Sequence, residues 1–539
     1  MKTCLLMLLA FTIATLAAAK PPADAQARLD GFLKSKPGGV SVAWVDADGV
    51  AFLSAGKFSA TDARPITPDT QFEIGSVTKV FTALLLAESE RAGKVSRNDP
   101  VAKYLLPPGD PDAAKLEKIT LLALSTHTAG LMTWPTNFRM PTKPNPFVDI
   151  TTADLVAALR TDGPNAPAGR NFAYSNFGVA LLGQALAAAW GKPYADVLRE
   201  HVLTPLGLER TIVAVPGTKP SPDLAPGHAS GKPAENWELD GYAPAGAIRS
   251  SAREFAKFLQ AALGDEHAPL AAAFRETTKP LRPTDFIGGG IGLNWLLLDD
   301  PQRPVIWHNG GTGGYRSFLG FSRAAGVGVA VLFNGSAGPD ALGFNLLGVK
   351  PPTPIATKIE NATDYVGRYP LSDTFAINVT ESNGALFAQA TGQPRLTLRK
   401  VETDRFAVGG APAEISFERE ASGKVTALAL HQNGRDQRGP RGELPPPPKE
   451  LALPAETLRE YAGTFPLAPS FVITVTEENG ALFAQATGQQ KFPVFATAKD
   501  EFFYKVVDAR LSFERDASGK VVALTLHQGG RDMRATRSQ

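Results

Sequence analysis

The sequence has 539 residues, more than one ordinary hydrophobic core accommodates, so we expect two to four domains. Apolar residues make up 43% of the chain and charged residues 20%, which is typical of a soluble globular protein. The formal net charge of +2 and the absence of a basic run give no indication of a nucleic-acid partner.

The first residues have the pattern of a secretory signal peptide. Lys2 is followed by an apolar stretch and then by three alanines that end at Ala19. The stretch is shorter than the ~20 apolar residues of a membrane span, so we expect cleavage after residue 19, or as late as Ala25, and no stable membrane anchor. The only cysteine, Cys4, lies inside this segment, so the exported chain would have no disulfide. The sequence predicts a periplasmic or secreted bacterial protein, exported by a Sec-type signal.

Between about residues 27 and 350, strand patterns at both ends enclose helical patterns. The predicted elements are a hairpin at 40–56 turning at Asp48-Gly49, helices at 80–94, 176–190 and 251–263, and strands at 304–311, 315–321 and 326–334. Ser250 or Ser251 is available as the N-cap of the third helix. This order predicts one α+β domain whose two ends meet in a single antiparallel sheet.

Ser76 and Lys79 stand one helical turn apart where an apolar run begins, in FEIGSVTKVFTALLLA. A serine hydroxyl becomes nucleophilic when a nearby base takes its proton, and residues i and i+3 of a helix share a face. Burial of the helix favours a lowered lysine pKa, which makes Lys79 a usable proton acceptor. The same spacing at Ser54 and Lys57 lies in a strand pattern, where the two side chains point to opposite faces. On spacing alone, Ser76 could equally be an N-cap beside a solvated lysine.

Tyr174 and Asn176 flank one serine in FAYSNFGVALLG, directly before the second predicted helix. The intervening residue lets both side chains point into one cleft. Tyrosine can move a proton as phenol or phenolate, and asparagine can bond both a lysine and a substrate amide. The alternative is an ordinary loop that begins a helix.

A third candidate segment is His308-Asn309-Gly310-Gly311, at the end of a predicted strand. Consecutive glycines let a substrate approach the backbone closely. A backbone N–H group there can form half of an oxyanion hole, with the N–H of Ser76 as the other half. Taken alone, the segment favours an ordinary loop over a catalytic role.

The last third of the chain is an internal repeat. NGALFAQATGQ occurs at Asn383 and again at Asn479, 96 residues later, and the same offset relates His431 to His527. Each copy alternates apolar and polar residues between turn signals, which predicts a small antiparallel β module. We expect a first domain at 27–350, repeat 1 at 355–440, a proline-rich linker at 441–453 and repeat 2 at 454–539. The two histidines are repeat-equivalent and no histidine has zinc-ligand spacing, so we expect them to be structural and expect no metal or other cofactor.

The three segments together resemble the motifs of the penicillin-recognising serine hydrolases, which comprise class C β-lactamases, DD-peptidases, D-aminopeptidases and related esterases. FEIGSVTK resembles their Ser-x-x-Lys box, YSN their Tyr-x-Asn box, and HNGG stands where their Lys/His-x-Gly box does. THTAGL at Thr126, PLGL at Pro205 and PAGAIRSSA at Pro244 are further matches. The resemblance covers residues 27–348. It implies a β-lactamase/transpeptidase-like domain, with an antiparallel sheet flanked by helices and a helical subdomain, followed by two small all-β domains.

By this resemblance, Ser76 forms an acyl-enzyme while Lys79 and Tyr174 move the protons. The predicted substrate-binding residues are Asn176, His308, Asn309 and Gly310, and the predicted oxyanion hole is formed by Ser76 and Gly311. Nothing resembles a dedicated deacylating glutamate, so Lys79 or Tyr174 is expected to serve both half-reactions.

His308 stands where most β-lactamases have lysine, and histidine there is more similar to DD-peptidases and D-aminopeptidases. Because the unperturbed pKa of histidine is near 6.5, we expect His308 to be partly charged at neutral pH. Its imidazolium would then bind a substrate carboxylate, with affinity falling as the pH rises through its pKa.

The predicted function is therefore an exported serine hydrolase that cleaves amide bonds of β-lactams or D-Ala-D-Ala-type peptides. The alternatives are a D-aminopeptidase or small-ester esterase, and a penicillin-binding sensor that acylates without turnover. The expected partner is a small-molecule or peptide substrate, and the sequence does not indicate an oligomeric state. The absence of a Gly-x-Ser-x-Gly elbow argues against an α/β-hydrolase. We expect the leaving group to be selected by loops such as 131–147, which no motif constrains.

Overall fold

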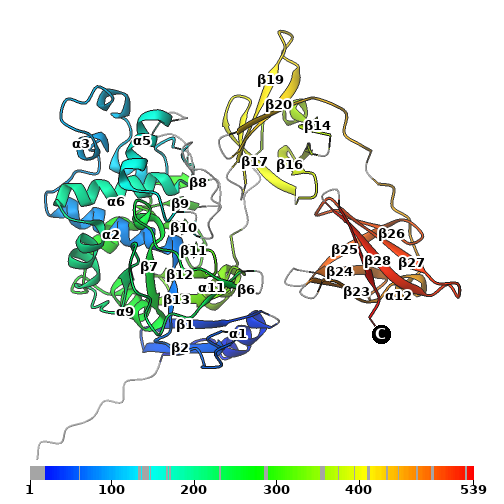
Figure 1. Ribbon diagram of the computed structural model, residues 1–539, viewed down its shortest axis with the longest axis horizontal. Coiled ribbons are helices and arrows are strands. Elements are labelled where there is room, and N and C mark those ends of the chain that lie inside the picture. Colours follow the sequence, from blue (N-terminus) through cyan, green and yellow to red (C-terminus); the bar gives the residue numbers. More distant parts are fainter. Residues whose placement is uncertain are drawn as a thin grey trace, which may run out of the picture.

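The computed structural model describes residues 19–538 except 35, 60, 132–134, 136–144, 146, 165–167, 169–171, 230–231, 285–288, 353–357, 374, 394, 410–412, 433–434, 447, 469–470, 487–490 and 529–530. The predicted signal peptide and most of the 131–147 loop lie outside the described residues. Figure 1 shows a mixed helix-and-sheet domain followed by two separate β modules, the first in yellow and the second in orange to red. This architecture is the predicted one.

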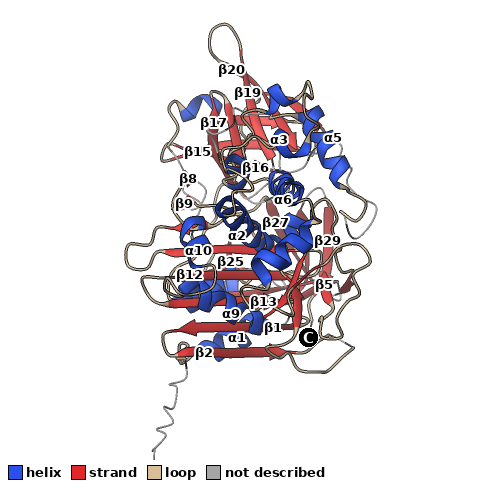
Figure 2. Ribbon diagram, turned by 90° about the vertical axis from the view of Figure 1, so that its left-hand side faces the viewer, coloured by secondary structure: helices blue, strands red, loops and turns tan. Residues whose placement is uncertain are grey.

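The first domain is built around an eight-stranded sheet. Its strands, in spatial order, are β2 (Gly49–Gly56), β1 (Gly39–Asp46), β13 (Val327–Phe333), β12 (Arg316–Ser322), β11 (Val305–Gly311), β10 (Leu296–Leu298), β9 (Gly289–Ile291) and β8 (Arg282–Thr284). β1, near the start of the domain, pairs antiparallel with β13, near its end, with Val40 opposite Phe333. The two ends of the domain therefore meet as predicted. Figure 2 shows these strands running side by side.

The hairpin turn comes one residue earlier than predicted. Asp46 pairs with Gly49, which leaves Ala47 and Asp48 as the turn residues. A carboxylate oxygen of Asp46 accepts the N–H groups of Asp48 and Gly49, at 2.9 and 3.2 Å. This side-chain cap on the turn fixes where the strand ends.

Helices pack on both faces of the sheet and extend into a helical subdomain. They are α1 (Ala25–Leu33), η1 (Gly75–Val77), α2 (Thr78–Arg91), α3 (Ala102–Leu105), η2 (Ala113–Leu116), α4 (Leu121–Ser125), α5 (Thr152–Asp162), α6 (Asn176–Trp190), α7 (Tyr194–Leu198), η3 (Arg199–Leu203), α8 (Ala243–Gly246), α9 (Ala252–Leu263), α10 (Ala271–Thr277) and α11 (Asp340–Leu347). Short sheets are formed by β3 (Gln71–Glu73), β7 (Ile248–Ser251) and β4 (Ile212–Val213), and by β5 (Gly227–Ala229) and β6 (Lys232–Ala234). Of the two serines predicted as possible N-caps of α9, Ser251 is the cap, and its side chain accepts the N–H of Glu254.

The two faces of the sheet belong to two hydrophobic clusters. Along β1, Val42 and Trp44 pack with α1 and α11, whereas Ala43 and Val45 pack with α2 and α9. Strand alternation therefore separates the two sides of the sheet. The side chains of β11 alternate in the same way, so His308 and Gly310 share a face.

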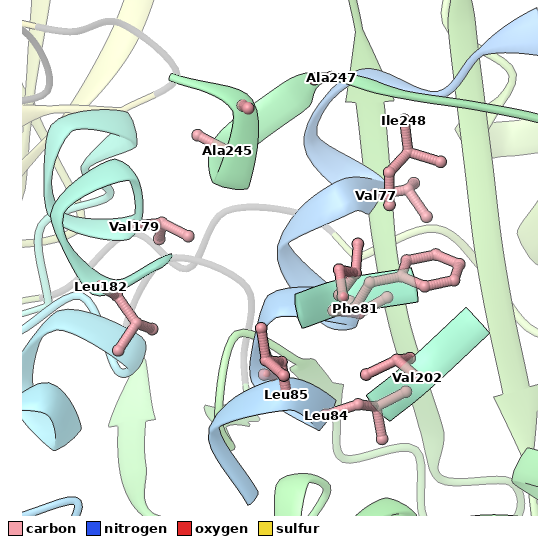
Figure 3. Close-up of a cluster of buried hydrophobic side chains, with 14 of the residues drawn as sticks. Val77, Phe81, Leu84, Leu85, Val179, Leu182, Val202, Ala245, Ala247 and Ile248 are labelled. Carbon is pink, nitrogen blue, oxygen red and sulfur yellow. The ribbon is translucent and has the colours of Figure 1, made fainter. Parts of the chain in front are cut away.

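Helix α2 is the centre of the larger cluster, and every residue from Thr78 to Ala87 is buried. Figure 3 shows Phe81 and Leu85 among apolar side chains of α6, η3 and the segment around α8. A helix that is apolar on all sides is expected at such a position. The segment that carries Ser76 is thereby anchored to the larger hydrophobic cluster.

Each β module is a barrel-like meander of eight consecutive antiparallel strands with its own apolar core. The first contains η4 (Ala362–Tyr365), β14 (Gly367–Pro370), β15 (Ala376–Ser382), β16 (Ala385–Ala390), β17 (Arg395–Glu402), β18 (Arg405–Val408), β19 (Ala413–Arg419), β20 (Val425–Gln432) and β21 (Arg435–Pro440). The second contains α12 (Ala455–Glu460), β22 (Gly463–Ala468), β23 (Phe471–Glu478), β24 (Ala481–Ala486), β25 (Lys491–Ala498), β26 (Glu501–Tyr504), β27 (Ala509–Arg515), β28 (Val521–Gln528) and β29 (Arg531–Thr536). Arg399 of the first module donates to the carbonyl of Phe172 in the first domain, at 2.8 Å.

A search of the described helices for one long and apolar enough to cross a membrane finds none.

We predict that Gly183→Ala lowers the thermal unfolding midpoint of the first domain and disturbs the geometry of the site. A Cβ at Gly183 of α6 would lie 2.1 Å from the Cβ of Pro244 in α8, so the two helices must separate. Overpacking of this kind costs about 1–3 kcal/mol. Calorimetry on the full chain measures the shift.

The matched control is Gly178→Ala in the same helix. A Cβ there meets Ser175 and Leu124 at 3.4–3.5 Å, an ordinary contact, so the change should be neutral or stabilising by up to about 1 kcal/mol. Equal midpoints for both variants would contradict the close packing of α6 on α8.

Candidate active site

The nucleophile candidate Ser76 lies in η1, directly before α2. Gly75 has φ +50, and a Cβ on it would come within 2.5 Å of the backbone nitrogen of Gly311. Only glycine allows this conformation together with so close an approach. The turn that carries Ser76 therefore lies directly against the end of β11.

Lys79 meets Ser76 as the helical spacing predicts, and it also has two further partners. Its Nζ lies 3.0 Å from Ser76 Oγ, 2.7 Å from Asn176 Oδ1 and 2.8 Å from the carbonyl oxygen of Ala245. The side chain is fully buried, and this burial holds the pKa of Lys79 well below its usual value. A neutral amine has two hydrogens and one lone pair, and the amide and backbone oxygens can only accept. When the amine is deprotonated, they take its two hydrogens, which leaves the lone pair for the hydroxyl hydrogen of Ser76.

Tyr174 completes the set around the Ser76 hydroxyl. The two side chains are hydrogen-bonded, and burial raises the pKa of Tyr174 above its ordinary value. The side chain is therefore a phenol at neutral pH, which settles the choice between phenol and phenolate left open by the sequence. The Lys79 Nζ lies 5.1 Å from the centroid of the tyrosine ring.

His127 is a site residue that the sequence analysis did not predict, although it lies in THTAGL, one of the segments that resemble the family. Its ring packs on the ring of Tyr174 with centroids 4.5 Å apart. Its carbonyl oxygen accepts the N–H of Ala173 at 2.7 Å, and its Nδ1 accepts the N–H of Ser175 at 3.1 Å. These two bonds bracket Tyr174, so His127 is a positioning residue for the phenol. Its positive φ of 54° marks it as locally strained, which is common near active sites.

The predicted oxyanion-hole residues are brought together. A Cβ on Gly310 would lie 2.0 Å from the carbonyl oxygen of Ile74 and 3.0 Å from the nitrogen of Ser76. The backbone of residues 310–311 therefore lies beside the nitrogen of the nucleophile, as a two-donor oxyanion site requires. Among the described pairings, β10 contacts β11 only at residues 305–307, so the edge at 308–311 faces Ser76 rather than another strand.

His308 differs from the expectation of partial charge. It is 1% exposed, and its Nδ1 donates to the carbonyl of Asn309 at 2.6 Å. Burial, and after it the positive charge that Lys79 carries when protonated, lower the pKa of His308 to about 3. Its imidazole is therefore neutral at neutral pH, and the predicted imidazolium contact with a substrate carboxylate is wrong. Burial among distant segments is not visible in the local sequence.

Asn309 is also differently engaged than predicted. Its side-chain amide donates to Asp340 at the start of α11, at 2.7 Å, on the face of the sheet opposite His308. It therefore ties β11 to α11. On that same face Arg316 packs over Gly311, its Nη1 3.0 Å from where a Cβ of Gly311 would lie. Arg316 Nη1 donates to the carbonyls of Thr312 and Tyr315, both at 2.7 Å.

The second Ser-x-x-Lys spacing lies away from this site. Ser54 is in β2, where its hydroxyl lies 3.3 Å from that of Ser41 on the neighbouring strand. Lys57 follows the end of that strand. The described residues contain no cluster of three or more His, Cys, Asp or Glu side chains arranged to bind a metal ion.

Comparison with known proteins gives a consistent result. A family profile described as "Beta-lactamase" matches residues 25–346. A profile described as "Domain of unknown function (DUF3471)" matches twice, at residues 351–441 and 447–537. The chain is thus similar to one family over most of its first domain and to another in each β module.

Individual relatives share about a quarter of their residues with this chain. A "Beta-lactamase" of Pseudomonas fluorescens is 27% identical over 330 residues, covering 55% of this chain and 88% of the relative. The "D-alanyl-D-alanine-carboxypeptidase/endopeptidase AmpH" of Escherichia coli (strain K12) is 28% identical over 326 residues, covering 56% and 80%. The crystal structure of a class C beta lactamase from Rhodobacter sphaeroides is similar with a TM-score of 0.52 and 24% identity, covering 60% of this chain and 99% of that one. The structural likeness shows a shared fold.

The buried neutral state of His308 predicts a specific loss of stability in acid. The unfolded chain binds a proton near pH 6.5, whereas the folded chain does so only near pH 3. Between these values the unfolded state holds more protons, so stability falls as the pH falls, by up to ~1.4 kcal/mol per pH unit. His308→Gln should lose stability less steeply between pH 6.5 and 4.

Thermal unfolding of the full chain across this pH range measures the slope. His267→Gln, at an exposed position, serves as the control and should follow the wild type. If the His308 variant and the wild type have the same slope, the histidine is not held neutral.

Proposed function

Since this chain belongs to the beta-lactamase family, as the match over residues 25–346 shows, we propose that it is an exported serine hydrolase that forms an acyl-enzyme on Ser76. The observation that carries this proposal is the hydrogen-bond set of Lys79. Two acceptors occupy its hydrogens and its third position faces the Ser76 hydroxyl at 3.0 Å. This arrangement supports lysine as the base that activates the nucleophile.

In the proposed acylation step, Ser76 Oγ attacks the substrate carbonyl carbon and its proton passes to Lys79 Nζ. The N–H groups of Ser76 and Gly311 stabilise the oxygen that becomes negative, as such donors do in acyl transfer. Tyr174 is a phenol hydrogen-bonded to Ser76, so it can pass a proton toward the leaving amine and regain one from the lysine. Water then cleaves the acyl-enzyme, with the same lysine as base.

We propose amide bonds of β-lactams or D-Ala-D-Ala-type peptides as the substrates. Support comes from the relatives, which include a protein named as a D-alanyl-D-alanine carboxypeptidase/endopeptidase. A D-aminopeptidase or small-ester esterase is the second candidate, because the neutral His308 supplies no positive charge for a carboxylate. A sensor that acylates without turnover is the third. A panel of nitrocefin, D-Ala-D-Ala peptides, D-amino-acid anilides and p-nitrophenyl esters separates the enzymes, and a penicillin label that persists for hours identifies the sensor.

Arg316 is the cation we propose for a carboxylate-bearing substrate. Its guanidinium packs over Gly311, the proposed oxyanion donor, and one of its nitrogens is bonded to the Thr312 and Tyr315 carbonyls. Those bonds fix the position of a permanent charge next to the strand edge that faces Ser76. Arginine remains charged when partly buried, which the histidine at position 308 does not.

We predict that Ser76→Ala abolishes covalent labelling by a fluorescent penicillin. The hydroxyl is placed against both Lys79 and Tyr174. Loss of this nucleophile should lower turnover by several orders of magnitude. Labelling is read on a denaturing gel and turnover by product release.

Ser54→Ala is the matched control, because Ser54 belongs to the other Ser-x-x-Lys spacing and lies on β2. It should label as the wild type does. Undiminished labelling of the Ser76 variant would refute the nucleophile assignment.

Arg316→Gln is expected to weaken the binding of carboxylate-bearing substrates selectively. A charge-assisted contact is worth roughly 1.5–3 kcal/mol, so KM for a D-Ala-D-Ala peptide should rise about 10- to 100-fold. KM and kcat for a neutral ester should change little, and Arg316→Lys should restore part of the peptide affinity.

Arg323→Gln is the comparison variant, since Arg323 lies just past the other end of β12 and also donates to a backbone carbonyl, that of Ala262. It should leave the ratio of peptide to ester activity unchanged. If Arg316→Gln weakens both substrates equally, the arginine only stabilises the turn at 312–315.

A further inference from the structure

The first β module carries a Ser–His–Asp hydrogen-bond chain on its outer face. Ser416 Oγ lies 2.8 Å from His431 Nε2, and His431 Nδ1 lies 2.7 Å from Asp436 Oδ1. The three residues come from the adjacent strands β19, β20 and β21. The neighbours Ile415 and Phe417 point into the module core, so the chain of polar groups faces outward.

The second module has the same arrangement at the positions 96 residues later. Ser512 Oγ lies 2.7 Å from His527 Nε2, and His527 Nδ1 lies 2.7 Å from Asp532 Oδ1. The sequence predicted both histidines to be structural, from their repeat-equivalence alone. Their hydrogen-bond partners were not apparent from that pattern.

The hydrogen bonds fix the histidine tautomer. An ionised aspartate can only accept, so Nδ1 carries the hydrogen and Nε2 presents its lone pair. That lone pair accepts the serine hydroxyl hydrogen. A serine, a histidine and an aspartate related in this way form the arrangement in which a serine becomes nucleophilic. The side chain of His431 is 26% exposed and that of Asp436 is 74% exposed, so small solutes can reach the site.

The charged residues beside the serine and the histidine are exchanged between the two modules. In the first module, Arg405 lies across from Ser416 and Glu414 across from His431, and the two form an ion pair in which Arg405 Nε donates to Glu414 at 2.6 Å. In the second module, Glu501 lies across from Ser512 and Arg510 across from His527. Directly opposite residues on antiparallel strands are close neighbours on one face.

This exchange of charge separates the two modules chemically. When serine attacks a carbonyl, negative charge develops beside the serine and positive charge develops on the histidine. In the first module the Arg405–Glu414 ion pair has its positive end beside the serine and its negative end beside the histidine, an orientation that stabilises both charges. The second module has each charge at the wrong position for this reaction.

We propose that Ser416 is a second nucleophile of this protein, which accepts acyl groups from small esters that reach it from solvent. Ser512 does not have this activity. Ser416 Oγ bonds to the ester carbonyl carbon as its proton moves to His431 Nε2. The bond to the alcohol oxygen then breaks, and the alcohol leaves with that proton. Water attacks the acyl-serine with His431 as base and releases the acid. This activity is additional to the function proposed for Ser76 and does not depend on it.

The test uses the full chain with Ser76→Ala, so that the nucleophile proposed for the first domain is absent. The protein is treated with p-nitrophenyl acetate and, separately, with a small fluorophosphonate, and modified serines are located by peptide mass spectrometry. Ser416 should be modified at least about tenfold faster than Ser512, given the size of cross-strand charge effects. Adding His431→Gln should abolish the modification.

A second variant tests the charge argument without touching either serine. In the Ser76→Ala chain, Glu501→Arg with Arg510→Glu gives the second module the charges of the first, and modification of Ser512 should then approach that of Ser416. No adduct on Ser416 would overturn the proposal. So would equal modification of Ser416 and Ser512 in the parent chain, or modification of Ser416 that persists without His431.

Discussion

The burial of one amine organises the first domain. Lys79 lies inside an apolar cluster, where an unpaired charge or an unsatisfied polar group is costly. Its hydrogen-bond partners come from η1, α6 and α8, three segments that lie far apart in the sequence. The helices can pack only where the oxygens of Asn176 and Ala245 reach the amine. Stability and chemistry therefore depend on the same three contacts.

Close backbone approach is the second requirement of this site. Gly75 and Gly310 let the turn with the nucleophile lie against β11, and Gly183 lets α6 lie against α8. A side chain at any of the three would move one wall of the site relative to another. His127 adds a further constraint by fixing the backbone on both sides of Tyr174. The phenol is thus positioned by packing rather than by a flexible loop.

Local patterns predicted what local interactions determine. The bounds of α6 match the predicted helix because its two caps, Ser175 and Gly191, lie directly before and directly after it in the sequence. Proximity of Ser76 and Lys79 follows from helical spacing. The contact between Lys79 and Asn176 spans 97 residues and could be expected only from family resemblance. The neutral state of His308 depends on burial by distant segments, so its charge was predicted wrongly. The direction of a strand side chain, as at residue 309, depends on register that the sequence does not show.

The sheet order has a consequence for how this protein is made. β1 pairs with β13, so the strand that contains Val40 has neighbours on both sides only after the segment that contains Phe333 has been synthesised. Each β module instead pairs every strand with the next one along the chain. Long-range pairing slows folding, and unpaired strand edges invite aggregation until the partner arrives. As the chain emerges from the ribosome, its first domain stays incomplete for nearly its whole length, whereas each module can fold strand by strand as it appears. The first-synthesised part is thus the one with the longest need for chaperone protection.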